Sequence, residues 1–139
     1  MLTKSSLVKY LASNSVKWIP EMPDGVPPEN IDIPEGHKFY RLTIGDTIAP
    51  SDILSYHELY PDRDWGEQTI NSYGLSIIDD LNKVGKLKKI PSLRACKGIS
   101  SIVLNPKDGV VLQTGKNNHY TWWRTSSFDI SVAETVMAL

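Results

Sequence analysis

The stretch from Pro20 to Pro34 constrains the fold of this chain more than any other. It holds five of the nine prolines, Pro20, Pro23, Pro27, Pro28 and Pro34, interleaved with Glu21, Asp24, Glu29 and Asp32 and followed by Glu35. Proline fixes φ and has no N–H to donate, so neither a helix nor a central strand continues through such a stretch. We therefore expect an extended, acidic connector over residues 20–37. It either crosses the surface as a strap or docks a basic partner.

The rest of the chain has to supply the core. With 139 residues, of which 40% are hydrophobic and 22% charged, the chain suits one folded domain over residues 1–139. A formal net charge of -1 gives no overall attraction to nucleic acid or to an anionic membrane. A protein is therefore the expected partner.

Two further features bear on the compartment. Cys96 is the only cysteine, so no disulfide forms within the chain. Residues 1–18 lack the continuous apolar stretch of a secretory signal. No apolar run reaches the length of about 18 residues that is needed to span a bilayer. These features predict a cytoplasmic protein.

Alternating and β-branched residues predict the strands. They cover residues 38–44, 75–78, 99–104, 110–114 and 119–128. The third and fourth of these runs flank the Asp108-Gly109 turn pair, which predicts a hairpin near 99–114.

Capping residues and apolar spacing predict short helices. One begins at Ser5 or Ser6 with Leu7 and Leu11 on a shared face, a second covers 51–60, and a third follows Asp79 or Asp80. A last helix over 131–139 is expected from the capping-box spacing of Ser131 and Glu134. This order predicts an α+β domain, with a mainly antiparallel sheet and flanking short helices.

The common catalytic and metal-binding motifs are missing. His37, His57, His119 and Cys96 lack zinc-ligand spacing, and neither a nucleophile elbow nor a phosphate loop occurs. We expect no metal and no cofactor. A basic cluster between Lys83 and Lys97 binds an anion, solvates a helix end or pairs with the acidic connector.

The densest group of recognition side chains is His119-Tyr120-Thr121-Trp122-Trp123-Arg124. In a strand, His119, Thr121 and Trp123 share one face, where they could hold a base, a sugar or a partner's side chain. The alternative is a core aromatic pair with a polar rim, in which at least one tryptophan is buried.

The expected elements follow in this order: a strand containing FYRL (39–42), a helix, YGLSI (73–77), a second helix and paired strands. This order resembles that of small ADP-ribosyltransferase domains. The resemblance implies that Arg41 contacts NAD and that Tyr73 and Ser76 line a nicotinamide pocket. Where that family places a late catalytic glutamate, the strand VVLQT supplies Gln113.

Two hypotheses follow, with one set of candidate binding residues: Arg41, Tyr73, Ser76, His119, Trp123 and Arg124. The first is a small accessory module that recognises another macromolecule without turnover. The second is an NAD-binding ADP-ribosyltransferase-like enzyme or a degenerate relative. A cleft that joins Arg41, Tyr73, Ser76 and His119 would favour the second, whereas a flat surface with Arg41 paired internally would favour the first.

Overall fold

The computed structural model describes residues 3–84, 94–116 and 118–138, and these form one α+β domain around a six-stranded antiparallel sheet. The strands are β1 (His37–Thr43), β2 (Leu75–Ile78), β3 (Gly98–Leu104), β4 (Gly109–Gln113), β5 (His119–Arg124) and β6 (Glu134–Ala138). Their order in the sheet is β4-β5-β2-β1-β3-β6. The predicted fold class is thus confirmed.

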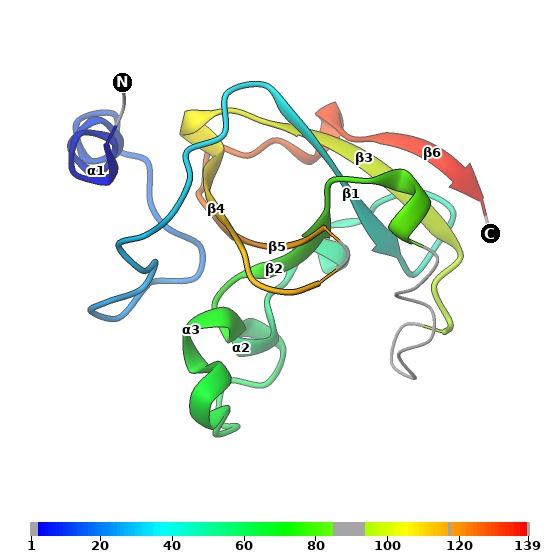
Figure 1. Ribbon diagram of the computed structural model, residues 1–139, viewed down its shortest axis with the longest axis horizontal. Helices are drawn as coiled ribbons and strands as arrows, with labels where there is room; N and C mark the ends of the chain where they lie inside the picture. The colour runs from blue at the N-terminus through cyan, green and yellow to red at the C-terminus, as the bar shows by residue number, and fades with distance from the viewer. Residues whose placement is uncertain (1–2, 85–93, 117, 139) are drawn as a thin grey trace.

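The sheet is strongly curved, and its strands surround the main core (Figure 1). Inward-facing side chains from β1, β2, β3, β4 and β5 meet there, and the ring of Trp122 packs edge-on against Phe128. Alternation along β5 is as expected: Tyr120 and Trp122 face this core, and Trp123 faces the opposite side of the sheet.

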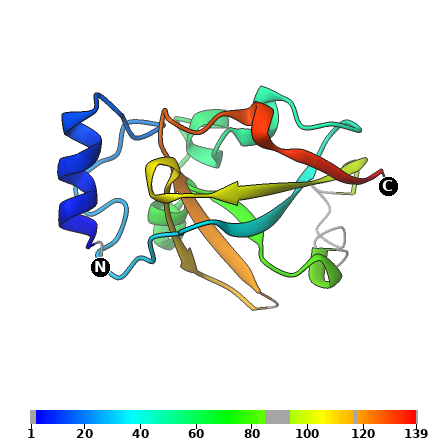
Figure 2. The ribbon, with the colours of Figure 1, turned by 90° about the horizontal axis from the view of Figure 1, so that it is seen from above.

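The outer face of β4 and β5 is also covered. Helix α1 (Lys4–Ser13) lies beside it, with Leu7 and Leu11 packed against Val110 and Trp123 (Figure 2). The proline-rich stretch runs along the same side and forms an isolated bridge between Asp32 and Val111 at the edge of β4. The helix is capped by Thr3 rather than by Ser5 or Ser6.

The predicted hairpin near 99–114 is wrong, although both of its strands exist. β3 pairs with β1 and β6, whereas β4 pairs with β5. The turn between β3 and β4 is bonded to β5: Trp122 Nε1 donates to the carbonyl of Asp108, and Thr125 Oγ1 donates to that of Lys107. These bonds bring β4 beside β5 and leave β3 across the core.

The predicted helix over 131–139 is also wrong. Residues Ile130–Val132 form a 3-10 turn, η6, and β6 then pairs along the edge of β3. Asp129, not Ser131, accepts the capping bond at the start of this turn. The open edge of β3 and the β-branched residues Thr135 and Val136 favour a strand here.

The expected helix over 51–60 is divided in two. A 3-10 turn, η1 (Pro50–Ile53), is followed by extended Leu54 and by a single helical turn, α2 (Tyr56–Leu59), which Ser55 caps. In the next stretch, residues 61–74, the turn-forming Asp62, Asp64 and Gly66 predict a surface loop. It contains instead η2 (Gly66–Gln68) and α3 (Thr69–Ser72).

After β2, residues 81–84 form a helical turn in which Val84 is buried. The rest of the helix expected there lies outside the described residues, as do Lys86, Lys88 and Lys89 of the basic cluster. No helix in the described part of the chain is long and apolar enough to cross a membrane.

Candidate functional site

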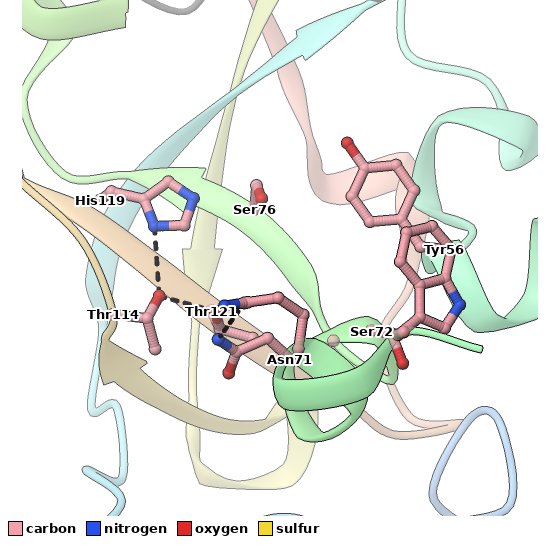
Figure 3. A pocket seen from close by; sticks show the side chains of 10 residues that line it. Tyr56, Asn71, Ser72, Ser76, Thr114, His119 and Thr121 are labelled. Atoms are coloured by element: carbon pink, nitrogen blue, oxygen red, sulfur yellow. Dashed lines mark hydrogen bonds between the residues drawn. The ribbon is translucent and has the colours of Figure 1, made fainter. Parts of the chain in front are cut away.

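A pocket of about 220 Å³ lies between the sheet and the α2–α3 region. Its lining comes from two sources, the strand ends and the short helices (Figure 3). The residues are Tyr56, Trp65, Gln68, Asn71, Ser72, Gly74, Ser76, Thr114, His119 and Thr121.

The sheet side of the pocket depends on the pairing of β2 with β5. Ser76 lies opposite Thr121, and Ile78 lies opposite His119. Thr114, just after β4, connects the two β5 side chains, with its Oγ1 at 3.1 Å from His119 Nδ1 and at 2.7 Å from Thr121 Oγ1. Hydroxyl groups and one imidazole therefore form this wall (Figure 3).

Burial controls the charge of His119. It lowers the pKa of the imidazole from the ordinary value of 6.5, because the charged form loses hydration. No carboxylate forms an ion pair with His119 among the described residues. The imidazole is therefore neutral at pH 7, with one ring nitrogen as donor and the other as acceptor.

The helical side of the pocket carries rings and amides. Tyr56 begins α2, and Asn71 on α3 donates from Nδ2 to Gln68 Oε1 at 3.2 Å. Trp65 lies 5.3 Å from Tyr56 between ring centroids. Its indole N–H is buried and has no acceptor in the described part of the structure.

Arg41 and Arg124 lie behind this wall and hold it to the sheet. The Arg41 guanidinium donates to the carbonyls of Asp52 and Ser76, and Arg124 Nε donates to that of Ile53. Arg124 Nη2 also lies 3.5 Å from Glu58 Oε2. Burial lowers the pKa of both arginines, partly offset by Asp52 and Glu58 respectively. Arg41 is thus paired internally.

Two other candidate residues serve the structure around the pocket. Tyr73 stacks on His57, with ring centroids 4.0 Å apart, and is not among the lining residues. Trp123 is fully buried, and its Nε1 donates to the carbonyl of Ile70 at 3.1 Å. It therefore lies in the core beneath α3 and is not exposed for recognition.

Of the six candidates, Ser76 and His119 line the pocket, and Arg41, Tyr73, Trp123 and Arg124 do not. Sequence reasoning missed the helical side: Tyr56, Trp65, Gln68 and Asn71. The available signal was the concentration of aromatic and amide side chains over residues 56–71. From the sequence, this stretch is expected to form the end of the 51–60 helix and a loop.

The pocket is chemically neutral. None of its ten lining residues is a carboxylate, lysine or arginine. No group of three possible metal ligands exists in the described part of the chain. The walls can therefore form hydrogen bonds and ring contacts, and for proton transfer they offer the imidazole of His119 and the phenol of Tyr56.

Comparison of this chain with family models, with curated proteins and with solved structures gave no match.

Proposed function

We propose that this protein is a binding module that recognises another protein through the pocket and the side chains around it, without turnover. The observation that carries the proposal is the exposure of large apolar side chains on one short segment. Tyr56, Leu59, Tyr60 and Ile70 each expose more than two fifths of their surface, and half-buried Trp65 lies among them. We call these five residues the α2–α3 surface.

Such a concentration is typical of an interface. Single exposed apolar residues are common on proteins, but a group rich in tyrosine and tryptophan beside a pocket resembles the core of a binding surface. The pocket adds shape to this surface. At about 220 Å³ it is smaller than the sites that enclose drug-sized ligands, and it suits one side chain or one ring.

The lining also favours binding over catalysis. General acid and base chemistry commonly uses two groups with different pKa values, and nucleophilic catalysis needs a base within hydrogen-bond reach of the nucleophile. Here the Thr114 hydroxyl lies within hydrogen-bond reach of His119, but no carboxylate or other group in the described part of the structure bonds the second ring nitrogen and orients the imidazole as a base. Neutral donors and acceptors can select a partner group without transforming it.

Selection of peptides from a random library tests this proposal. Peptides selected on the protein should lose at least tenfold in affinity for the double variant Leu59→Ser/Tyr60→Ser. They should also shift the NMR signals of Thr114 and Thr121 in the pocket.

The matched control is Val8→Ser/Tyr10→Ser on α1. These two side chains are 41% and 51% exposed, against 46% and 52% for Leu59 and Tyr60. The control should bind the selected peptides as the parent protein does. Equal losses in both double variants, or shifts confined to residues far from the pocket, would contradict the proposal.

A second candidate is NAD binding, favoured by one observation: Ser76 and His119 line the same pocket. The pocket has room for the nicotinamide ring, and the rest of the dinucleotide would lie outside it. Arg41, bonded to two carbonyls, is not among the lining residues, and Gln113 is exposed outside the pocket. Titration with NAD should shift the Ser76 and His119 signals if this candidate holds. Release of free nicotinamide would show turnover and overturn the binding-only proposal.

A further inference from the structure

We propose that the aromatic cluster formed by Tyr56, Tyr60 and Trp65 binds an arginine or lysine side chain from a basic segment of the partner protein. This inference rests on the proposed function, because the cluster is part of the α2–α3 surface. It adds the chemical class of the partner, which the pocket alone does not define.

The three rings lie close enough to act together. The Trp65 centroid is 5.3 Å from that of Tyr56 and 6.4 Å from that of Tyr60, with interplanar angles of 31° and 51°. Tyr56 and Tyr60 are four residues apart, and the N–H of Tyr60 donates to the carbonyl of Tyr56 at 2.8 Å. One helical turn therefore presents both phenol rings beside the indole.

A cation already lies on this cluster. The guanidinium carbon of Arg63 is 4.4 Å from the centroid of the Trp65 ring, which is a cation–π contact. Arg63 belongs to the chain itself and is exposed, so the contact is weak. A partner's arginine or lysine, supported by further contacts, can take the same place on the indole.

The charges around the cluster favour a basic partner. Residues 44–74 contain six carboxylates: Asp46, Asp52, Glu58, Asp62, Asp64 and Glu67. Arg63 is the only lysine or arginine in this range. Asp52 accepts bonds from the backbone of Ile44 and Ala49, and Glu58 pairs with Arg124. The three carboxylates nearest Arg63 in the sequence, at positions 62, 64 and 67, are exposed. They attract a basic segment and repel an acidic one.

A hexa-arginine peptide is a direct probe. Titration into the labelled protein should shift the NMR signals of Tyr60 and Trp65, with an affinity that falls as salt is added. A hexaglutamate peptide should produce no such shifts. Hexa-arginine shifts confined to the acidic connector at 20–37 would overturn the inference.

Two variants with matched controls test the roles of the side chains. Arg63→Ala removes the competing cation and should tighten hexa-arginine binding about threefold. Lys9→Ala removes the same charge from an exposed position of α1 and should change this binding less. Tyr60→Leu should weaken binding roughly three- to fivefold, and Tyr10→Leu on α1 should leave it unchanged. Equal effects within either pair would overturn the inference.

The outcome is separable from that of the proposed function. Selected peptides that need Leu59 and Tyr60 but contain no arginine or lysine would overturn the basic-partner inference and support the binding module. Selected peptides that bind both double variants with the affinity of the parent protein would overturn the binding module itself.

Discussion

Gly74 lies where the chain leaves α3 and enters β2, and at this point the backbone passes very close to β5. A Cβ atom placed on Gly74 would lie 2.4 Å from Thr121 Cγ2 and 3.1 Å from the Trp122 carbonyl oxygen. Both neighbours are buried, so neither can move without cost. Only glycine allows the helical and sheet sides of the pocket to approach so closely.

Gly74→Ala should therefore lower the free energy of unfolding by about 1 to 3 kcal/mol, the usual cost of overpacking. It should also shift the Thr121 methyl signal. Gly45→Ala is the matched control, because the nearest atom to its Cβ is the Thr47 carbonyl oxygen at 3.8 Å. Chemical denaturation compares the two variants, and equal stabilities would show that the close approach relaxes freely.

One part of the pH dependence of stability follows from the lowered pKa of His119. An unfolded histidine titrates near 6.5, so below that pH the unfolded chain binds the proton more readily than the folded protein does. The contribution of neutral His119 to the free energy of unfolding is fully present above pH 6.5. It is lost as the pH falls through the lower pKa of the folded protein. His119→Gln should reduce the loss of stability between pH 7.5 and 5.5 measured by urea denaturation. An NMR titration that places the folded pKa at or above 6.5 would contradict this assignment.

At the scale of elements, the segment from Ala49 to Leu59 depends on the sheet for its position. η1 and α2 are each about one turn long, and such short helices are not stable alone. Arg41 and Arg124 hold consecutive carbonyls of this segment, those of Asp52 and Ile53. The wall that carries Tyr56 therefore takes its place from β1 and β5.

Arg41→Met should lower the free energy of unfolding by about 3 kcal/mol, because two buried bonds to a charged donor are lost. The amide protons of residues 49–59 should exchange faster than those of β3. Arg63→Met is the control, since Arg63 is exposed and surface substitutions usually change stability by less than about 0.5 kcal/mol. An Arg41→Met variant as stable as this control would show that the bonds of Arg41 do not stabilise the fold. Arg41 would then again be a candidate for ligand binding.

Strands could be predicted from the sequence more readily than their partners. Alternation in residues 119–124 depends on neighbouring side chains and predicted both the strand and its faces. The separation of β3 from β4 depends on bonds from Trp122 and Thr125, which no local pattern contains. His119 was found because a predicted strand places it, and Ser76 because residues 73–77 resemble a motif of another family. Asn71 was missed because α3 is oriented by tertiary contacts such as the bond from Trp123.

For the whole molecule, three clusters of buried side chains in the described part of the chain share one sheet. The main core lies inside the curve, and a second cluster joins α1 and the proline-rich stretch to Val110 and Trp123 outside it. Lys4 supports this outer layer through its contacts with the Pro27 carbonyl and Glu29. Because both tryptophans of β5 are fully buried, neither layer is an optional addition.

Leu7→Ala should consequently lower the free energy of unfolding by about 2 to 5 kcal/mol, although Leu7 lies far from the pocket in the sequence. Val8→Ala, at a position 41% exposed on the same helix, should change it by less than about 0.5 kcal/mol. Denaturation monitored by far-UV circular dichroism and by tryptophan fluorescence should give one midpoint for each variant. A separate early transition in Leu7→Ala would show that α1 unfolds independently of the sheet.

The direct pairing of β1 with β2, in which Tyr40 lies opposite Ile78, has a consequence for how such proteins diverge. Residues 44–74 leave the sheet and return to it at neighbouring strands, so much of this stretch, apart from buried Ile53 and from Gly74, can be exchanged without altering a strand. Arg41 and Arg124 bond to backbone carbonyls of the stretch, which every replacement sequence also provides. A change of the helical side of the pocket can therefore be confined to one continuous piece of the gene, while Ser76, His119 and Thr121 stay in the strands.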